Sequence, residues 1–114
     1  MQVIIHLAGK VPVAILKGRM DALTSADVKV QLLSAIHPGV PMLIIDCSLL
    51  DYLSSAGIRV LYQVARVMAD WQGEVVFCST TEIVSEIFSM VGLDTDFKIF
   101  PRLEAALDLV KEKY

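Results

Sequence analysis

The sequence lacks the motifs on which most catalytic and cofactor sites depend. It has no glycine-rich phosphate-binding loop, no pair of histidines four residues apart and no cluster of cysteines. Its two histidines, His6 and His37, fall on a predicted strand and in a predicted turn, and neither has a second ligand nearby in the sequence. We therefore expect a protein that is not an enzyme and that binds neither a cofactor nor a metal ion.

Cysteine is scarce, and basic residues are not concentrated anywhere. The two cysteines, Cys47 and Cys78, each end an apolar run. We predict that both are reduced core residues, although the ends of parallel strands could bring them together as a disulfide. The ten basic residues are spread along a chain of net charge −3, so nucleic acid is not an expected partner.

Long apolar runs are also missing. Although the mean hydropathy is +0.62, no run approaches the roughly 18 to 20 residues that a membrane-spanning helix needs. The first ten residues lack the features of an export signal. We expect a cytoplasmic protein without membrane insertion. Because 55% of the 114 residues are hydrophobic, we expect one domain, residues 1–114, with its own core.

The first half of the chain alternates between strand and helix patterns. Residues 3–7 and 11–16 predict two strands joined as an antiparallel hairpin. A helix is expected over 25–36, with Thr24 or Ser25 as its cap. The apolar stripe expected on this helix consists of Ala26, Val30 and Leu33, with Leu32 and Ile36 beside it.

A buried central strand is predicted over residues 42–46, where a continuous apolar run ends in an acid. The clearest helix covers 56–70, because its polar positions recur at steps of four, three and four and so share one face. These positions are Arg59, Gln63, Arg66 and Asp70. Gly73 is expected to stop this helix.

The last part predicts a buried strand over 74–78, a helix over 82–91 ended by Gly92, a short strand near 97–100 and a helix over 103–111. The third helix should follow Thr80 or Thr81 and face the core through Ile83, Ile87 and Met90. The alternation indicates an α/β fold. We expect a mixed sheet of four to five strands, largely parallel apart from the hairpin, and about four helices.

Two groups of polar residues stand at predicted loops or strand ends. The acids Asp21, Asp46 and Asp51 occupy positions from which α/β proteins present functional groups, but acids there also stabilise turns and helix starts. Ser54 and Ser55 stand where a loop enters the strongest helix, at which free amides and the helix dipole favour a phosphate. The residues alone leave a plain serine cap as the alternative.

Three segments together resemble one protein family. They are Gly18 to Asp21, then Ile44 to Asp46 with Leu50 to Leu61, and finally Met90 to Leu93. In their order and spacing they resemble the STAS domains of bacterial anti-sigma factor antagonists, over essentially the whole chain. The central segment is the most specific of the three.

The resemblance implies a partner-switching mechanism and no catalysis. The unmodified antagonist binds an anti-sigma factor serine kinase and frees the kinase's target, phosphorylation ends that binding, and a serine phosphatase restores the unmodified form. Alignment on Gly57 places the phosphorylated residue at Ser55, with Ser54 as the alternative. A free monomer is expected. The other function left open is a STAS subunit of a membrane transport or lipid-trafficking ATPase complex.

The sequence departs from the common family pattern on both sides of Ser55. Ser54 stands where the pattern has an Asp, and Ala56 stands where it has a second hydroxyl. Asp21 resembles the acid of the family's partner-binding surface. The expected partner-binding residues are Asp21, Ser54, Ala56, Gly57, Arg59 and Gln63.

Overall fold

The computed structural model describes residues 1–114, with five strands and five helices. In chain order these are β1 (Gln2–Ala8), β2 (Val11–Met20), α1 (Ser25–Ser34), β3 (Met42–Leu53), α2 (Ser55–Asp70), β4 (Glu74–Cys78), α3 (Glu82–Val91), α4 (Leu93–Asp96), β5 (Ile99–Phe100) and α5 (Leu103–Lys113). The four-residue helix α4 is not predicted by the sequence. None of the helices is long and apolar enough to cross a membrane.

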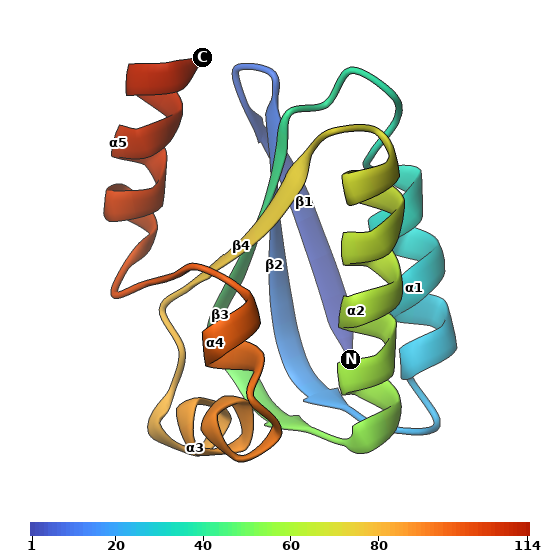
Figure 1. The fold of residues 1–114 in the computed structure, drawn as a ribbon. Helices are drawn as coiled ribbons and strands as arrows, with labels where there is room; N and C mark the ends of the chain where they lie inside the picture. The colour runs from blue at the N-terminus through green and yellow to red at the C-terminus, as the bar shows by residue number, and fades with distance from the viewer.

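The strands form one mixed sheet in the order β1-β2-β3-β4-β5. β1 and β2 pair antiparallel, and every other neighbouring pair is parallel. This confirms the predicted α/β fold and its N-terminal hairpin. Helices α1 and α2 lie side by side on one face of the sheet, and α5 lies on the other (Figure 1).

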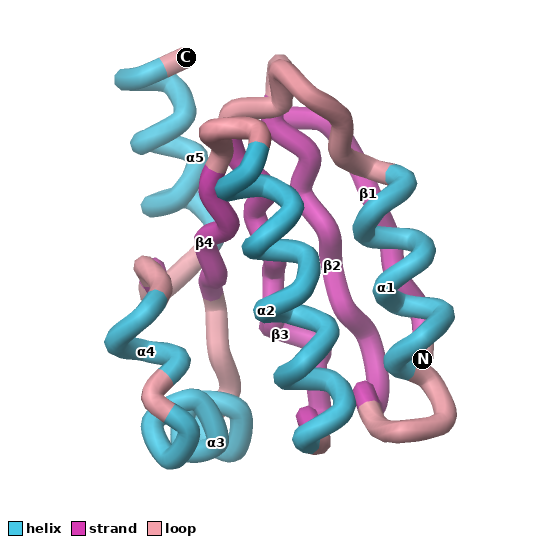
Figure 2. The backbone as a smooth tube through the Cα atoms, turned by 45° about the vertical axis from the view of Figure 1, so that its right-hand side comes forward, coloured by secondary structure: helices cyan, strands magenta, loops and turns pink.

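Two apolar cores hold the layers together. The larger core lies between the sheet and helices α1 to α4, and it includes Leu16, Ile45 and Phe77. The smaller core lies under α5, where Ala106 and Val110 pack against β2, β3 and β4. The tube in Figure 2 shows α1 and α2 beside each other in front of the strands, and α5 packs on the opposite face, so both faces of the central strand β3 are covered.

The central strands run further than the sequence predicts. β2 continues to Met20 instead of Leu16, and β3 continues to Leu53 instead of Asp46. The two strands stay paired to these ends, so each strand supplies backbone hydrogen-bond partners for the other. The pairing has two irregularities, at each of which β3 has one extra residue. Asp51 therefore lies in a strand and not in a loop.

The stripe predicted for the α1 segment is confirmed in part, because Leu32 and Ile36 are buried and Leu33 is half-buried against the larger core. Val28 and Leu32 are its buried apolar residues, whereas Ala26 faces solvent and Val30 is 62% exposed. Val28, Leu32 and Ile36 recur every fourth residue, a spacing as typical of one helix face as the steps of four and three from Ala26 to Val30 and Leu33. The spacing of the apolar residues allowed two overlapping faces of α1 to be buried. Packing against the sheet buries the face that contains Val28 and leaves Val30 exposed.

The predicted buried face of α3 is also only partly right, since Ile87 packs half-buried against the larger core. Its buried residues are Val84 and Phe88, while Ile83 and Met90 of the predicted face are 56% and 84% exposed. The predicted ends are confirmed, with Gly92 in the left-handed conformation at φ +77°. Phe88 makes an edge contact with Phe77 of β4, at 5.2 Å between ring centroids, which fixes the buried face of α3.

Helix α2 has the predicted face and ends at the predicted residue, Asp70, but Gly73 is not what ends it. Its exposed residues include the four polar positions predicted from the spacing, Arg59, Gln63, Arg66 and Asp70. The left-handed residue after the helix is Gln72, at φ +63°, and not Gly73. Gly73 instead allows the backbone to pass close to Val40, because a Cβ at residue 73 would lie 2.8 Å from the Val40 carbonyl oxygen.

The two cysteines lie on opposite faces of the sheet. Cys47 belongs to the larger core and Cys78 to the smaller one, and both are free and buried. The open alternative of a disulfide is therefore excluded by geometry, and the prediction of reduced core cysteines is confirmed. Burial raises the pKa of the Cys47 thiol and that of Cys78, the latter to about 11, so both remain protonated at neutral pH.

The contact between α2 and α4 predicts a pH dependence of stability. The Tyr62 hydroxyl donates a hydrogen bond of 2.6 Å to the Asp96 carboxylate, which raises the pKa of Tyr62 to about 12. Because the folded pKa lies above the unfolded value of about 10, this contribution is complete below pH 10 and is lost as the pH rises toward 12.

We expect Tyr62→Phe to lower the free energy of unfolding at pH 8 and to reduce its decline between pH 10 and pH 12, measured by urea denaturation at a series of pH values. Tyr114→Phe is the control, because the Tyr114 hydroxyl makes no hydrogen bond. A decline of the same size in wild type and Tyr62→Phe would show that the Tyr62–Asp96 bond does not contribute.

Candidate functional site

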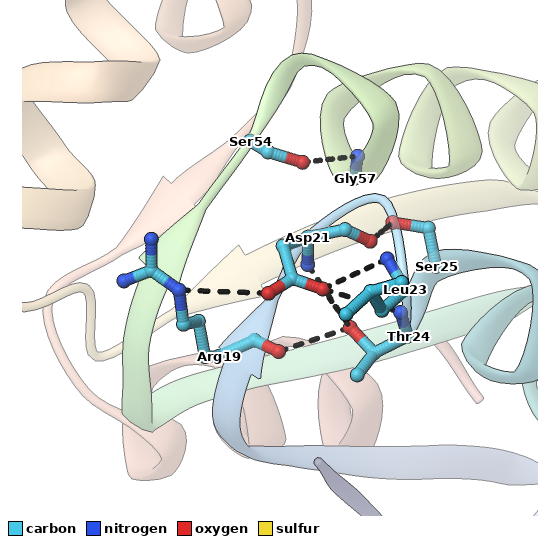
Figure 3. Close-up of polar contacts among 7 residues, drawn as sticks. All are labelled: Arg19, Asp21, Leu23, Thr24, Ser25, Ser54 and Gly57. Carbon is cyan, nitrogen blue, oxygen red and sulfur yellow. Dashed lines mark hydrogen bonds and ion pairs between the residues drawn. The ribbon is translucent and has the colours of Figure 1, made fainter.

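The candidate site lies where β2 and β3 end at the same edge of the sheet. Each strand leads into a turn and then a helix, so the turns before α1 and α2 are neighbours (Figure 3). The Ser54 amide donates a hydrogen bond of 2.9 Å to the carbonyl oxygen of Met20, which joins the two turns directly. This edge of parallel sheets is where α/β proteins usually present functional groups.

Asp21 organises the turn between β2 and α1. Its carboxylate accepts hydrogen bonds from the amides of Leu23, at 3.0 Å, and Thr24, at 3.2 Å. The bond from Leu23 is the largest cause of a lowered Asp21 pKa. The Ser25 hydroxyl donates to the Asp21 carbonyl oxygen. Asp21 is therefore a turn-forming residue whose charged carboxylate remains partly exposed.

Thr24 occupies the cap position of α1 without capping it. Its backbone is helical, at φ −106° and ψ −20°, whereas a capping side chain needs an extended backbone. Its hydroxyl donates to the Arg19 carbonyl oxygen at 3.0 Å and accepts from the Asp21 amide at 2.9 Å. The Thr24 side chain therefore links Arg19 and Asp21 within the turn and does not cap α1.

Arg19 connects the two turns through its side chain. Its guanidinium lies 4.1 Å from the centre of the Tyr52 ring on β3, and its Nε lies 3.5 Å from the Asp21 carboxylate. Arg19 and Tyr52 are register partners on β2 and β3, which explains the stacking. Sequence reasoning missed both residues, because their pairing depends on the unpredicted extension of the strands.

Ser54 and Ser55 have different environments although they are adjacent. Ser54 is the cap of α2, with an extended backbone at φ −86° and ψ 173°, and its hydroxyl accepts from the Gly57 amide at 3.3 Å. Ser55 is the first residue of α2 and is exposed. Its hydroxyl makes no hydrogen bond within the protein, so it is accessible to a reagent from outside.

Gly57 faces the interior of the protein and not the solvent. A Cβ at this position would lie 2.7 Å from the Leu53 side chain and 3.1 Å from the Met20 carbonyl oxygen. The sequence analysis placed Gly57 among the expected partner-binding residues. The structure gives a packing reason for this glycine, the close approach of α2 to the end of β2. Ala56, beside it, is half-buried.

Arg59 and Gln63 lie along the exposed edge of α2 and line one side of a groove of about 490 Å³. The other lining residues are Tyr62, Ala65, Arg66, Ala69 and Phe97. Neither Arg59 nor Arg66 forms an ion pair within the chain. Sequence reasoning placed Arg66 on the polar face but could not find Phe97, which comes from the segment after α4.

The remaining acids form no ligand site. Asp46 is buried at 6% exposure, and its carboxylate accepts from the Ser48 amide at 2.9 Å, which supports the irregular part of β3. Asp51 is exposed on β3, away from any ion pair. No group of three or more His, Cys, Asp or Glu residues is placed to hold a metal ion.

Residues 4–106 match the family model of the STAS domain. The chain belongs to the STAS domain family. Among named relatives, this STAS domain is 32% identical over 94 residues to BtrV of Bordetella bronchiseptica, which is named as an anti-sigma factor antagonist. The matched region covers 82% of this chain and 81% of BtrV.

Solved structures show the same fold at low sequence identity. An anti-sigma factor antagonist from Mycobacterium paratuberculosis has a TM-score of 0.86 at 22% identity, covering 96% of this chain and 93% of the other. SpoIIAA in its unphosphorylated form has a TM-score of 0.83 at 18% identity, covering 99% of each chain. The STAS domain of a SulP transporter from Vibrio cholerae has a TM-score of 0.75 at 17% identity, covering 95% and 86%.

The different environments of the two serines predict different effects on stability. We expect Ser54→Ala to lower the free energy of unfolding by about 1 kcal/mol, because it removes the cap of α2. Ser55→Ala should change it by less than about 0.5 kcal/mol, because this hydroxyl has no partner. Urea denaturation of the two variants measures both values, and equal losses would contradict the assignment of Ser54 as the cap.

Gly57→Ala tests the close approach of α2 to β2. Alanine favours helix by up to about 1 kcal/mol over glycine, yet we expect a net loss of stability of about 1 to 3 kcal/mol, because the new methyl group overlaps Leu53 and Met20. Thermal and urea denaturation measure the change, with Ser55→Ala as the control in the same turn. A more stable Gly57→Ala variant would refute the packing constraint.

Proposed function

We propose that this STAS domain is an anti-sigma factor antagonist in a partner-switching pathway and that Ser55 is its regulatory site. The observation that carries the proposal is the exposed, unbonded Ser55 hydroxyl at the first position of α2. It occupies the position that the family resemblance assigns to the phosphorylated residue. The adjacent Ser54 is engaged as a cap, so it is the less accessible of the two hydroxyls.

In the proposed active state, the unmodified domain binds an anti-sigma factor serine kinase and the kinase releases its target. The docking surface would include the Ser55 turn and the exposed edge of α2. Arg59 and Gln63 are available there, because Arg59 has no ion pair within the chain and both side chains are exposed. The Asp21 carboxylate, fixed by its own turn, adds a negative charge at the same edge.

In the proposed inactive state, the γ-phosphoryl group of the kinase's ATP is transferred to the Ser55 oxygen, which loses its proton, and ADP is released. The product adds about 1.5 to 2 negative charges at the start of α2. This end of the helix tolerates them, because free amides point outward and the first turn contains no acidic residue. Folding is therefore preserved while the surface changes.

The phosphate would prevent binding in two ways. Residues four apart on a helix are neighbours, so phosphorylated Ser55 can pair with Arg59 and withdraw it from the partner. Any remaining charge must lose its water when the kinase docks, which opposes association. A serine phosphatase would restore the active form, and the domain itself would perform no catalysis and act in the cytoplasm, where the kinase finds ATP.

The fold alone does not separate this function from that of a transporter-associated STAS domain. The antagonist structures and the SulP transporter domain share it at similarly low identity. The observation that favours an antagonist is the 32% identity to BtrV, whose name carries that function.

The experiment is a titration of Ser55 variants against the anti-sigma factor serine kinases of the same organism, each purified separately. We expect Ser55→Asp to weaken binding at least about tenfold, a loss of about 1.4 kcal/mol, and Ser55→Ala to bind like the wild type. Isothermal titration calorimetry measures both affinities.

Stability controls separate lost binding from lost folding. Ser55→Asp should unfold at the same or a higher urea concentration than wild type, because a negative charge suits the start of α2. Asp21→Asn tests the docking surface separately, because its amide oxygen can still accept the turn's hydrogen bonds, so a changed kinase affinity would reflect the lost charge and not the fold. Equal kinase affinity of Ser55→Asp and Ser55→Ala would count against the proposed switch.

A further inference from the structure

The outer edge of the sheet at β1 is unprotected. β1 is a terminal strand of seven residues, and it contains no Lys, Arg, Asp, Glu or Pro. Its exposed apolar side chains include Ile4, Ile5 and Leu7, at 39%, 38% and 71% exposure. Soluble proteins usually protect such an edge with a charge, a proline or a covering segment, because it can pair with another strand.

The hairpin geometry indicates which backbone groups of β1 are free. Gly9, at φ +64°, and Lys10 form a two-residue turn, in which the Ala8 carbonyl typically bonds to the Val11 amide. In antiparallel pairs the residues alternate between bonded and non-bonded positions. Counting back from Ala8, the residues directed away from β2 are Val3, Ile5 and Leu7. No other segment bonds to the backbone of these three residues.

We propose that β1 is a self-association surface at which two copies of this chain pair through antiparallel β1 strands. With a two-fold axis at Ile5, each Ile5 lies opposite its counterpart, and Val3 of each copy lies opposite Leu7 of the other. These side chains all point to the face of the sheet that carries α1, since their partners on β2 include the core residues Ala14 and Leu16.

A second copy fits this edge for reasons of charge and symmetry. The chain has a net charge of −3, which repels another copy, but residues 2–9 contain no acidic or basic side chain apart from His6. A strand paired with itself makes the same contacts from both sides, as two-fold dimers require. The pairing joins two five-stranded sheets into one of ten strands.

The proposed dimer leaves the Ser55 surface open. Helix α1 packs against β1 and β2, while α2 packs against β3 and β4 and so lies away from the β1 edge (Figure 2). A dimer therefore presents two regulatory sites in one particle, which would strengthen binding to a partner that is itself dimeric. This departs from the free monomer expected from the family resemblance.

Sedimentation velocity of the full chain over a range of concentrations tests the proposal. We expect the wild type to reach twice the 12.5 kDa mass of one chain. Ile5→Lys should weaken the dimer at least about tenfold, because it places two positive charges opposite each other. Leu23→Lys is the matched control, since Leu23 is 93% exposed and lies outside β1, and it should dimerise like the wild type.

A charge-exchange mixture tests the register itself. Ile5→Lys and Ile5→Glu alone should each dimerise at least about tenfold more weakly than the wild type, and their mixture should recover the dimer because opposite charges then face each other. The proposal is overturned if the wild type stays at the mass of one chain at every concentration, if Ile5→Lys dimerises like the wild type, or if Leu23→Lys is equally impaired.

Amide hydrogen exchange of the wild type decides the matter if the lysine variant does not fold. We expect protection of Val3, Ile5 and Leu7 to rise with protein concentration, while protection of Ile4 and His6, already bonded to β2, stays constant. If the exchange protection of the amides of residues 3–7 does not depend on protein concentration, the proposed pairing through β1 is contradicted.

Discussion

The close contact between the end of β2 and the start of α2 is the constraint on which the site depends. The Ser54 amide bonds to the Met20 carbonyl at 2.9 Å, and the absence of a side chain at Gly57 lets the helix approach that carbonyl. The contact fixes where α2 begins, so it decides that Ser54 caps the helix and that Ser55 stands exposed beside it. The two adjacent serines thereby receive different roles from the backbone.

The same contact gives the proposed switch a rigid support. Asp21, held by amides of its own turn, and Arg19, stacked on Tyr52, brace the neighbouring turn, so a charge added at Ser55 meets a fixed surface. The helix start can accept a phosphate without rearrangement, because its amides already point outward. The modification would then act on the partner's docking and not on the fold, which suits a reversible signal.

Sequence patterns predicted the elements better than their faces and ends. The alternating strands and helices, the polar face of α2 and the left-handed Gly92 follow from local rules, and all were confirmed. The buried stripes of α1 and α3 were only partly right, with Leu32 and Ile36 confirmed but Val30 and Met90 exposed, because each helix carries two apolar stripes and only packing on the sheet selects one. Arg19 and Tyr52 were missed because their contact requires the exact register of β2 and β3. The serines were found through the family resemblance, whereas their distinct environments came from the structure.

The most direct test of the central claim is the modification state of this protein in its own cells. Intact-mass and peptide mass spectrometry of the protein, purified under conditions in which its signalling pathway is active and inactive, identifies any phosphate on the segment that contains Ser54 and Ser55. We expect a phosphate on Ser55 whose occupancy changes between the two conditions. A phosphate confined to Ser54, or a protein unmodified in both conditions, would contradict this expectation.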